Sequence, residues 1–201
     1  MRKVPFFLAV VAGVLLSSGP ARTAELETAI FAGGCFWCVE SDFDQVEGVK
    51  TTVSGYIGGS RDNPTYQDHV EGGFREAVEI KFDPDAVSYA ELLKIFFRSV
   101  DPTDGDGQFC DRGTSYSTAV YAVDDTQKAE AEAAKKAAAD ELDRRLATEI
   151  IPAPTFWPAE DYHQNYYVEN PLRYKVYRYR CGRDQRIEQL WGDQAMYGIE
   201  H

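Results

Sequence analysis

Residues 33–40 read GGCFWCVE, and this stretch joins a predicted strand to a predicted helix. The strand runs from Glu27 to Phe31, and from Cys35 to about Gln45 the apolar residues recur at helical spacing. Unpaired N–H groups and a partial positive charge at a helix N-terminus can lower the pKa of a thiol placed there. The stretch therefore predicts a reactive thiolate and makes sulfur chemistry the leading hypothesis for function.

The rest of the chain mixes strands and helices without a regular βαβ repeat. The pattern predicts strands at residues 49–57, 76–82, 118–123 and 148–151, a helix capped by Ser88, and a long helix from Asp124 or Asp125 to about Leu146. Loops rich in Gly and Pro separate these elements, which favours an α+β domain over a doubly wound sheet. We expect a two-layer sandwich of a mixed sheet with helices, built as a ferredoxin-like core with extensions.

Length and charge limit the classes of function. The chain has 201 residues, of which 44% are hydrophobic and 13% aromatic, and this is enough for one large domain with its own core. Its formal net charge of -12 at pH 7 disfavours binding to nucleic acid or to an anionic membrane surface.

The N-terminal segment is typical of a secretory signal peptide. A basic start is followed by an apolar run from Val4 to Leu16, which is short for a membrane span, and then by small residues. We expect cleavage after Ala21 or Ala24, so that residues 1–24 are the signal peptide and 25–201 are a single catalytic domain. The expected location is outside the cytoplasm, in the periplasm, and an uncleaved membrane anchor is the less favoured alternative.

Five motifs follow one another in a fixed order along residues 28–181. They are GCFW at 34–37, GYIGG with NPTY at 55–66, EAV at 76–78, DRGTSYS at 111–117 and PAEDYHQNYY at 158–167. In this order they resemble the peptide methionine sulfoxide reductases of the A class, which are specific for the S epimer. The resemblance implies an enzyme that reduces methionine-S-sulfoxide, free or in proteins, and thereby repairs oxidised proteins.

The resemblance makes Cys35 the nucleophile and Glu76 the acid near the sulfoxide oxygen. Reduction of a sulfoxide requires a thiolate to attack sulfur while the departing oxygen gains protons, so a nucleophile and a nearby acid are the minimum. A Glu must hold a proton to act as that acid, and burial beside aromatic side chains raises its pKa in the needed direction. Without the resemblance, Glu76 at the start of a strand would be interpreted as a solvated carboxylate.

The same resemblance implies a binding pocket. Phe36 and Trp37 are expected to wall a site for the S-methyl group, because flat aromatic faces suit an apolar methyl. Tyr66, Asp111 and Tyr116 are expected to complete the polar end, where tyrosine hydroxyls can donate to the oxygen as negative charge develops. By default these aromatic residues would be packed rings, and only their order in the chain favours the functional interpretation.

Attack would leave Cys35 as a sulfenic acid, which a second thiol converts to a disulfide. Residues three apart on a helical turn lie within about 5–6 Å, so Cys38 can reach Cys35 with little movement. The resemblance points instead to Cys181 near the C-terminus, although its spacing from Asn170-Pro171 is long. We expect Cys38 to be the resolving cysteine, with Cys110 and Cys181 either paired structurally or passing the disulfide outward.

The remaining expectations concern partners and alternatives. We expect no bound cofactor, and a thioredoxin-like external reductant, because disulfide exchange needs a partner thiolate. We also expect a monomer without stable membrane insertion after cleavage of the signal peptide. His163 is interpreted as a packed histidine rather than a catalytic base. No metal is expected, because a zinc site of four cysteines would need two Cys-x-x-Cys pairs and the chain has one. A general thiol–disulfide oxidoreductase and a metal-bound binding module are the competing hypotheses.

Overall fold

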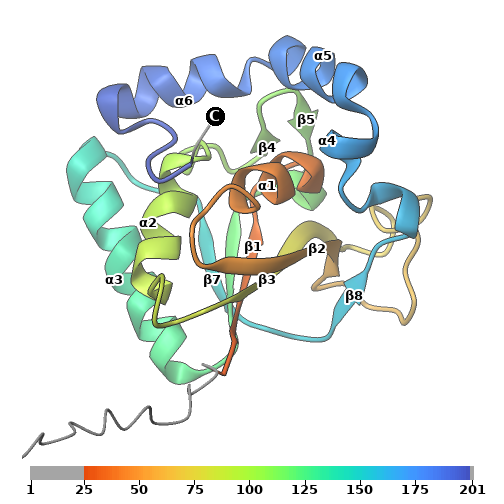
Figure 1. The fold of residues 1–201 in the computed structure, drawn as a ribbon, viewed down its shortest axis with the longest axis horizontal. Coiled ribbons are helices and arrows are strands. Elements are labelled where there is room, and N and C mark those ends of the chain that lie inside the picture. Colours follow the sequence, from red (N-terminus) through yellow and green to blue (C-terminus); the bar gives the residue numbers. More distant parts are fainter. Residues whose placement is uncertain (1–24, 200–201) are drawn as a thin grey trace, which may run out of the picture.

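The computed structural model describes residues 25–199, and within them a six-stranded twisted sheet is the central element (Figure 1). In spatial order its strands are β7 (Glu149–Pro152), β6 (Ala119–Ala122), β1 (Glu27–Ala32), β3 (Arg75–Phe82), β2 (Val49–Ile57) and β8 (Phe156–Pro158). The helices are α1 (Phe36–Phe43), α2 (Tyr89–Arg98), α3 (Asp125–Leu142), α4 (Tyr166–Glu169), α5 (Pro171–Cys181) and α6 (Arg183–Trp191). The predicted signal peptide, residues 1–24, lies outside the described residues.

The core of the sheet has the split βαβ arrangement of a ferredoxin-like fold. Strand β3 lies between β1 and β2 and runs antiparallel to both, while β1 lies between β3 and β6. Two strands extend this core, since β7 pairs in parallel with β6 and β8 pairs antiparallel with β2. The prediction of an α+β fold with a ferredoxin-like core and extensions is confirmed.

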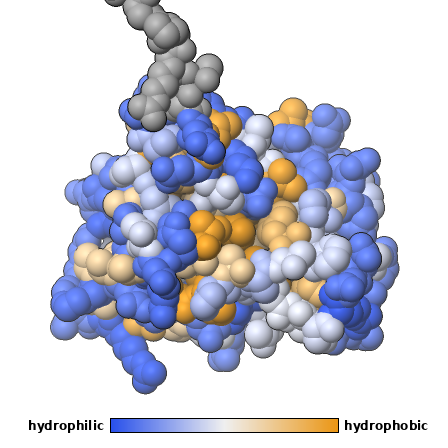
Figure 2. Space-filling view, turned by 90° about the horizontal axis from the view of Figure 1, so that it is seen from below, coloured by the Kyte–Doolittle hydropathy of each residue, from blue (hydrophilic) through white to orange (hydrophobic). Residues whose placement is uncertain are grey.

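The two layers follow from the alternation of side chains along the strands. On one face of β1, Phe31 packs against Phe43 of α1 and Phe96 of α2, with ring centroids 5.3 and 4.8 Å away. On the opposite face, Ile30 belongs to a smaller apolar cluster with Tyr121 and partly buried neighbours. Figure 2 shows the molecule from below as a largely hydrophilic surface with apolar residues gathered near its middle.

Local signals account for the helix boundaries. The Ser88 hydroxyl accepts a hydrogen bond from the Glu91 N–H at 3.1 Å, as the predicted cap requires. Helix α3 ends at Leu142, short of the predicted Leu146, because Asp143 adopts a left-handed conformation that stops the helix. Between α2 and β6 the chain forms a small hairpin of β4 (Gly107–Gln108) and β5 (Asp111–Arg112), followed by the 3₁₀ turn η1 (Thr114–Tyr116).

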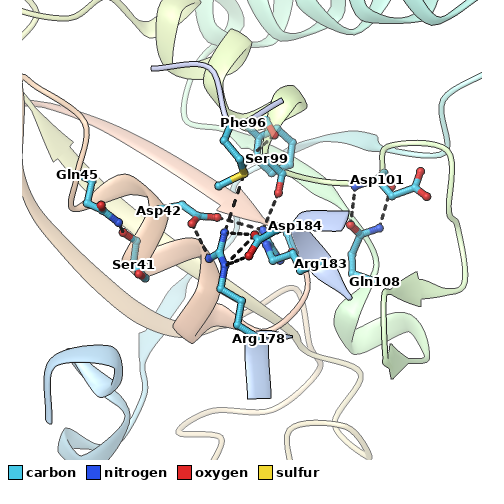
Figure 3. Close-up of polar contacts among 12 residues, drawn as sticks. Ser41, Asp42, Gln45, Phe96, Ser99, Asp101, Gln108, Arg178, Arg183 and Asp184 are labelled. Carbon is cyan, nitrogen blue, oxygen red and sulfur yellow. Dashed lines mark hydrogen bonds and ion pairs between the residues drawn. The ribbon is translucent and has the colours of Figure 1, made fainter. Parts of the chain in front are cut away.

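Helices α5 and α6 run along one end of the molecule, above α1 and α2 in the view of Figure 1. A buried ion cluster fixes them there (Figure 3): Asp42 of α1 accepts a hydrogen bond from Arg178 at 2.6 Å and pairs with Arg183 at 3.4 Å. Arg183 also donates to the Gly33 carbonyl at 3.1 Å and to the Ser99 carbonyl at 2.8 Å. The cluster therefore connects the C-terminal helices to the GGCFWCVE stretch.

None of the helices within residues 25–199 combines the length and apolarity needed to cross a membrane.

Candidate active site

Cys35 lies at the junction of β1 and α1, where it is the N-cap of the helix. Gly34 before it has φ +88°, and a Cβ there would come within 2.6 Å of the Gln108 side chain, so the turn requires glycine. Both Cys35 and Cys38 are buried and carry free thiols. The Cys35 carbonyl accepts the Cys38 N–H at 3.0 Å, which places the two cysteines on one turn, as the sequence predicted.

Glu76 points from β3 at the start of α1. Its Oε2 accepts a hydrogen bond from the Phe36 N–H at 3.0 Å, and the residue is only 2% exposed. Burial raises the pKa of Glu76 to about 8, with smaller contributions from the nearby Asp111 and Cys38. The predicted upward shift is confirmed in direction, and the carboxyl group holds a proton at neutral pH.

The pKa values of the two thiols shift in opposite directions. Burial raises the pKa of Cys35 well above its usual value, and the neighbouring Cys38 and Glu76 add to the rise. The hydrogen bond from Cys35 lowers the pKa of Cys38, with help from the charges of Arg183 and Arg178. The prediction of a lowered pKa at Cys35 is therefore wrong for the substrate-free site. The physical reason is the burial of Cys35 in the fold, which disfavours the charged thiolate.

Aromatic rings pack against Phe36 and Trp37, the two residues that follow Cys35 in the chain. The Trp37 indole stacks on Tyr166 with ring centroids 3.7 Å apart, and its Nε1 donates to His163 Nδ1 at 3.1 Å. Phe36 is buried and lies 5.0 Å from the His163 ring. His163 is thus a packed, hydrogen-bonding residue that orients the aromatic wall, as the sequence predicted.

The polar residues named by the sequence lie around the same point. Tyr116 has a raised pKa because of burial, and the charges that add to the rise are those of Glu76, Tyr66, Asp111 and Cys35. Tyr66 is 40% exposed, at the open side of the site. The structure thus brings together all of the residues expected at the nucleophile and at the polar end.

Three residues of the site had no role in the sequence analysis. His69 is buried, its Nε2 lies 3.7 Å from Glu76 Oε1, and its ring stacks on Tyr56 with centroids 5.0 Å apart. Glu160 accepts hydrogen bonds from the Tyr56 hydroxyl at 2.9 Å and from the Tyr66 N–H at 3.0 Å. The role of His69 could not be predicted, because a single histidine in a loop has no characteristic sequence pattern. Glu160 lies within the PAEDYHQNYY motif, so its place in the site could have been predicted.

Gln164 of the same motif is the third. Its side-chain amide accepts from the Ser54 N–H at 2.9 Å and donates to the carbonyls of Ser54 and Ala159 at 2.9 and 3.0 Å. These bonds attach the 159–164 segment to β2. The motif therefore ties to β2 the segment whose His163 bonds to Trp37.

Cys110 and Cys181 form a disulfide with each other, and a structural pairing is one of the two roles expected for them from the sequence. Cys110 is exposed and Cys181 is partly buried. Because these two sulfurs are bonded to each other, the four cysteines do not form a tetrahedral zinc site in this structure. Cys181 is likewise not free to react with Cys35 in this state.

A buried nucleophilic cysteine, an adjacent second thiol and a protonated carboxyl group define a thiol-dependent oxidoreductase. The family model "Peptide methionine sulfoxide reductase" matches residues 27–195. Peptide methionine sulfoxide reductase MsrA 2 of Rhizobium meliloti (strain 1021) is 58% identical over 182 residues, which cover 90% of this chain and 92% of that protein. The chain belongs to the peptide methionine sulfoxide reductase family.

Solved structures agree with this assignment. Methionine sulfoxide reductase A of Corynebacterium diphtheriae superposes with a TM-score of 0.70 at 33% identity, covering 78% of this chain and 79% of that one. Mxr1 from Saccharomyces cerevisiae, solved in complex with Trx2, has a TM-score of 0.50 at 22% identity, covering 73% of this chain and 91% of that one. The similarity to Mxr1 in this complex shows a shared fold.

Proposed function

We propose that this protein reduces methionine-S-sulfoxide, free or in proteins, to methionine. The observation that carries the proposal is the buried Glu76 carboxyl group, which holds a proton while bonded to the N–H of the residue that follows Cys35. A proton donor and a sulfur nucleophile are thereby fixed next to each other. Phe36 and Trp37 supply the apolar surface that a methyl group requires.

The reaction follows from these positions. Cys35 loses its proton and forms a bond to the sulfoxide sulfur, while Glu76 protonates the sulfoxide oxygen. The substrate S–O bond and the new sulfur–sulfur bond then break as the oxygen passes with one proton to the Cys35 sulfur. Cys35 is oxidised to a sulfenic acid, and methionine leaves as the reduced product. Tyr66 and Tyr116 donate to the oxygen while it carries negative charge, and Asp111 completes the polar end.

Cys38 is the proposed resolving cysteine. Its thiol attacks the Cys35 sulfur, a disulfide forms and water leaves. Two features favour Cys38 over Cys181: it lies on the same helical turn as Cys35, and Cys181 is bonded to Cys110. Mass mapping after one turnover without reductant is expected to find a Cys35–Cys38 bridge. A Cys35–Cys181 bridge in protein that retains Cys38 would overturn this assignment.

A dithiol protein of the thioredoxin type is the proposed reductant, because disulfide exchange requires a partner thiolate. The complex of Mxr1 with Trx2 is a precedent among proteins of this fold. The character of residues 1–24 supports export and a periplasmic location, where the protein would repair oxidised proteins as a monomer.

The deciding experiment uses both epimers of methionine sulfoxide with dithiothreitol as the reductant. Wild-type protein is expected to reduce the S epimer, and Cys35→Ser is expected to be inactive while retaining the fold by circular dichroism. If the wild type reduces neither epimer, or if Cys35→Ser stays active, the proposal fails.

A further inference from the structure

Tyr177 of α5 reaches into the site from the C-terminal part of the chain. Its hydroxyl donates a hydrogen bond to the Asp111 carboxylate and also lies within hydrogen-bonding reach of the Cys35 sulfur. Its ring meets Trp37 edge-on, with centroids 5.9 Å apart. One side chain thus contacts the proposed nucleophile, the pocket wall and the polar end.

The Cys110–Cys181 disulfide flanks this contact on both sides. Cys110 directly precedes Asp111 in the chain, and Cys181 lies one helical turn after Tyr177 on α5. The disulfide therefore links the segment of Asp111, which accepts the hydrogen bond, to helix α5, whose Tyr177 donates it.

We propose that Tyr177 is a further catalytic residue, whose hydroxyl contacts the Cys35 sulfur, and that the Cys110–Cys181 disulfide is the clamp that holds it there. This inference rests on the proposed function, since it assigns a role in the same reaction. It makes the disulfide a positioning device for the sulfoxide step rather than a carrier of electrons. The hydrogen bond from Tyr177 also lowers the pKa of Cys35, against the larger rise caused by burial.

The first test is Tyr177→Phe, which removes the hydroxyl and keeps the ring against Trp37. Its matched control is Tyr179→Phe on the same helix, because Tyr179 is 86% exposed. The protein used should have Cys35 and Cys38 as thiols and Cys110 bonded to Cys181, as verified by mass mapping. In a single turnover, methionine formation is expected to slow about five- to tenfold in Tyr177→Phe and to remain unchanged in the control.

A second readout separates a direct role from a loss of folding. The rate of Cys35 alkylation against pH is expected to shift to higher pH in Tyr177→Phe, because the thiolate loses a hydrogen-bond donor. The titratable and charged groups that face Cys35 stay in place in this variant: Cys38 from α1, Glu76 from β3, Asp111 from β5, Tyr66 and Tyr116. An unshifted profile together with an unchanged single turnover would overturn the proposal.

The clamp is tested by replacing both of its cysteines, Cys110→Ser with Cys181→Ser. The ion cluster of Asp42 still anchors α5 in this variant, which favours retention of the fold. Its single turnover is expected to slow as much as that of Tyr177→Phe. Adding Tyr177→Phe to the two cysteine substitutions is expected to cause no further slowing. A normal single turnover, with loss of turnover only when a dithiol protein is the reductant, would instead make the pair an electron carrier. If the wild type reduces no sulfoxide, the proposed function fails, while the alkylation profile still tests the Tyr177 contact.

Discussion

The raised pKa of Glu76 provides a proton for the reaction but lowers the stability of the fold as pH rises. The carboxyl group is protonated below a pKa of about 8 in the folded chain, whereas an exposed Glu in the unfolded chain titrates near 4.3. Between these values the folded state retains a proton that the unfolded state has lost. The contribution of Glu76 to the free energy of unfolding therefore falls as pH rises through this window, and above it the loss is complete.

Glu76→Gln separates the two effects. Gln does not titrate and can still accept from the Phe36 N–H, so the variant is expected to gain on the order of a few kcal/mol of stability relative to wild type above pH 8. The fall in its reductase rate relative to wild type is expected to be largest near neutral pH, where wild-type Glu76 still holds its proton and solvent protons are scarce. It is expected to be smaller at pH 9, where wild-type Glu76 has lost most of its proton. Denaturant unfolding and rates at pH 5, 7 and 9 measure both effects.

Glu79→Gln, on the same strand but partly exposed, is the matched control for Glu76→Gln. It should leave the pH dependence of stability and rate as in wild type. If Glu76→Gln shows the wild-type rate across the pH range, Glu76 is not the acid.

At the scale of elements, strand β8 leads into the segment whose His163 bonds to Trp37 and whose Glu160 bonds to the Tyr66 N–H. Gly55 of β2 pairs with Pro158 of β8, and a Cβ on Gly55 would lie 2.4 Å from both the Phe156 ring and the Trp157 carbonyl. No side chain fits between these strands without moving β8. Glu160 and Gln164 follow directly in the chain, so a displaced β8 would move them as well.

Gly55→Ala is expected to lose about 1–3 kcal/mol of stability through overpacking. It should also raise KM more than it lowers kcat, because the pocket wall shifts while Cys35 and Glu76 stay in place. Gly105→Ala is the control, since its Cβ would make an ordinary contact at 3.4 Å. Thermal unfolding with steady-state kinetics tests this, and an unchanged KM would contradict the role given to β8.

The elements that could be predicted from sequence are those whose stability is decided locally. The Ser88 cap, the strand at residues 49–57 and the junction between the first strand and the helix that follows it each depend on a few neighbouring residues, and each is found in the structure. Helices α5 and α6 could not be predicted, because they are held by Arg178 and Arg183, which reach an acidic partner 136 and 141 residues away. The raised pKa of Cys35 was missed for a related reason, since burial depends on the tertiary fold.

At the scale of the whole molecule, Asp42 joins helix α1 to helices α5 and α6, which lie far from it in the chain. It is fully buried, and its two arginine partners come from the C-terminal helices (Figure 3). Removing one partner of a buried ion pair leaves an uncompensated charge, which is far more costly than replacing the whole set.

Asp42→Asn is therefore expected to destabilise the protein by about 3–5 kcal/mol. The matched control is Asp140→Asn, which breaks the exposed pair with Lys136 and should cost less than about 0.5 kcal/mol. Urea unfolding of both variants measures the difference. Equal effects would mean that the buried cluster contributes no more than a surface pair.

The buried Cys35 thiol with its raised pKa has a consequence for survival among oxidants. Peroxides react with thiolates, and a buried nucleophile whose pKa is raised in the substrate-free site offers them little to attack. The Cys35 thiol therefore has low reactivity toward oxidants in the substrate-free site. An enzyme that works where methionine is being oxidised can keep its own sulfur intact between turnovers.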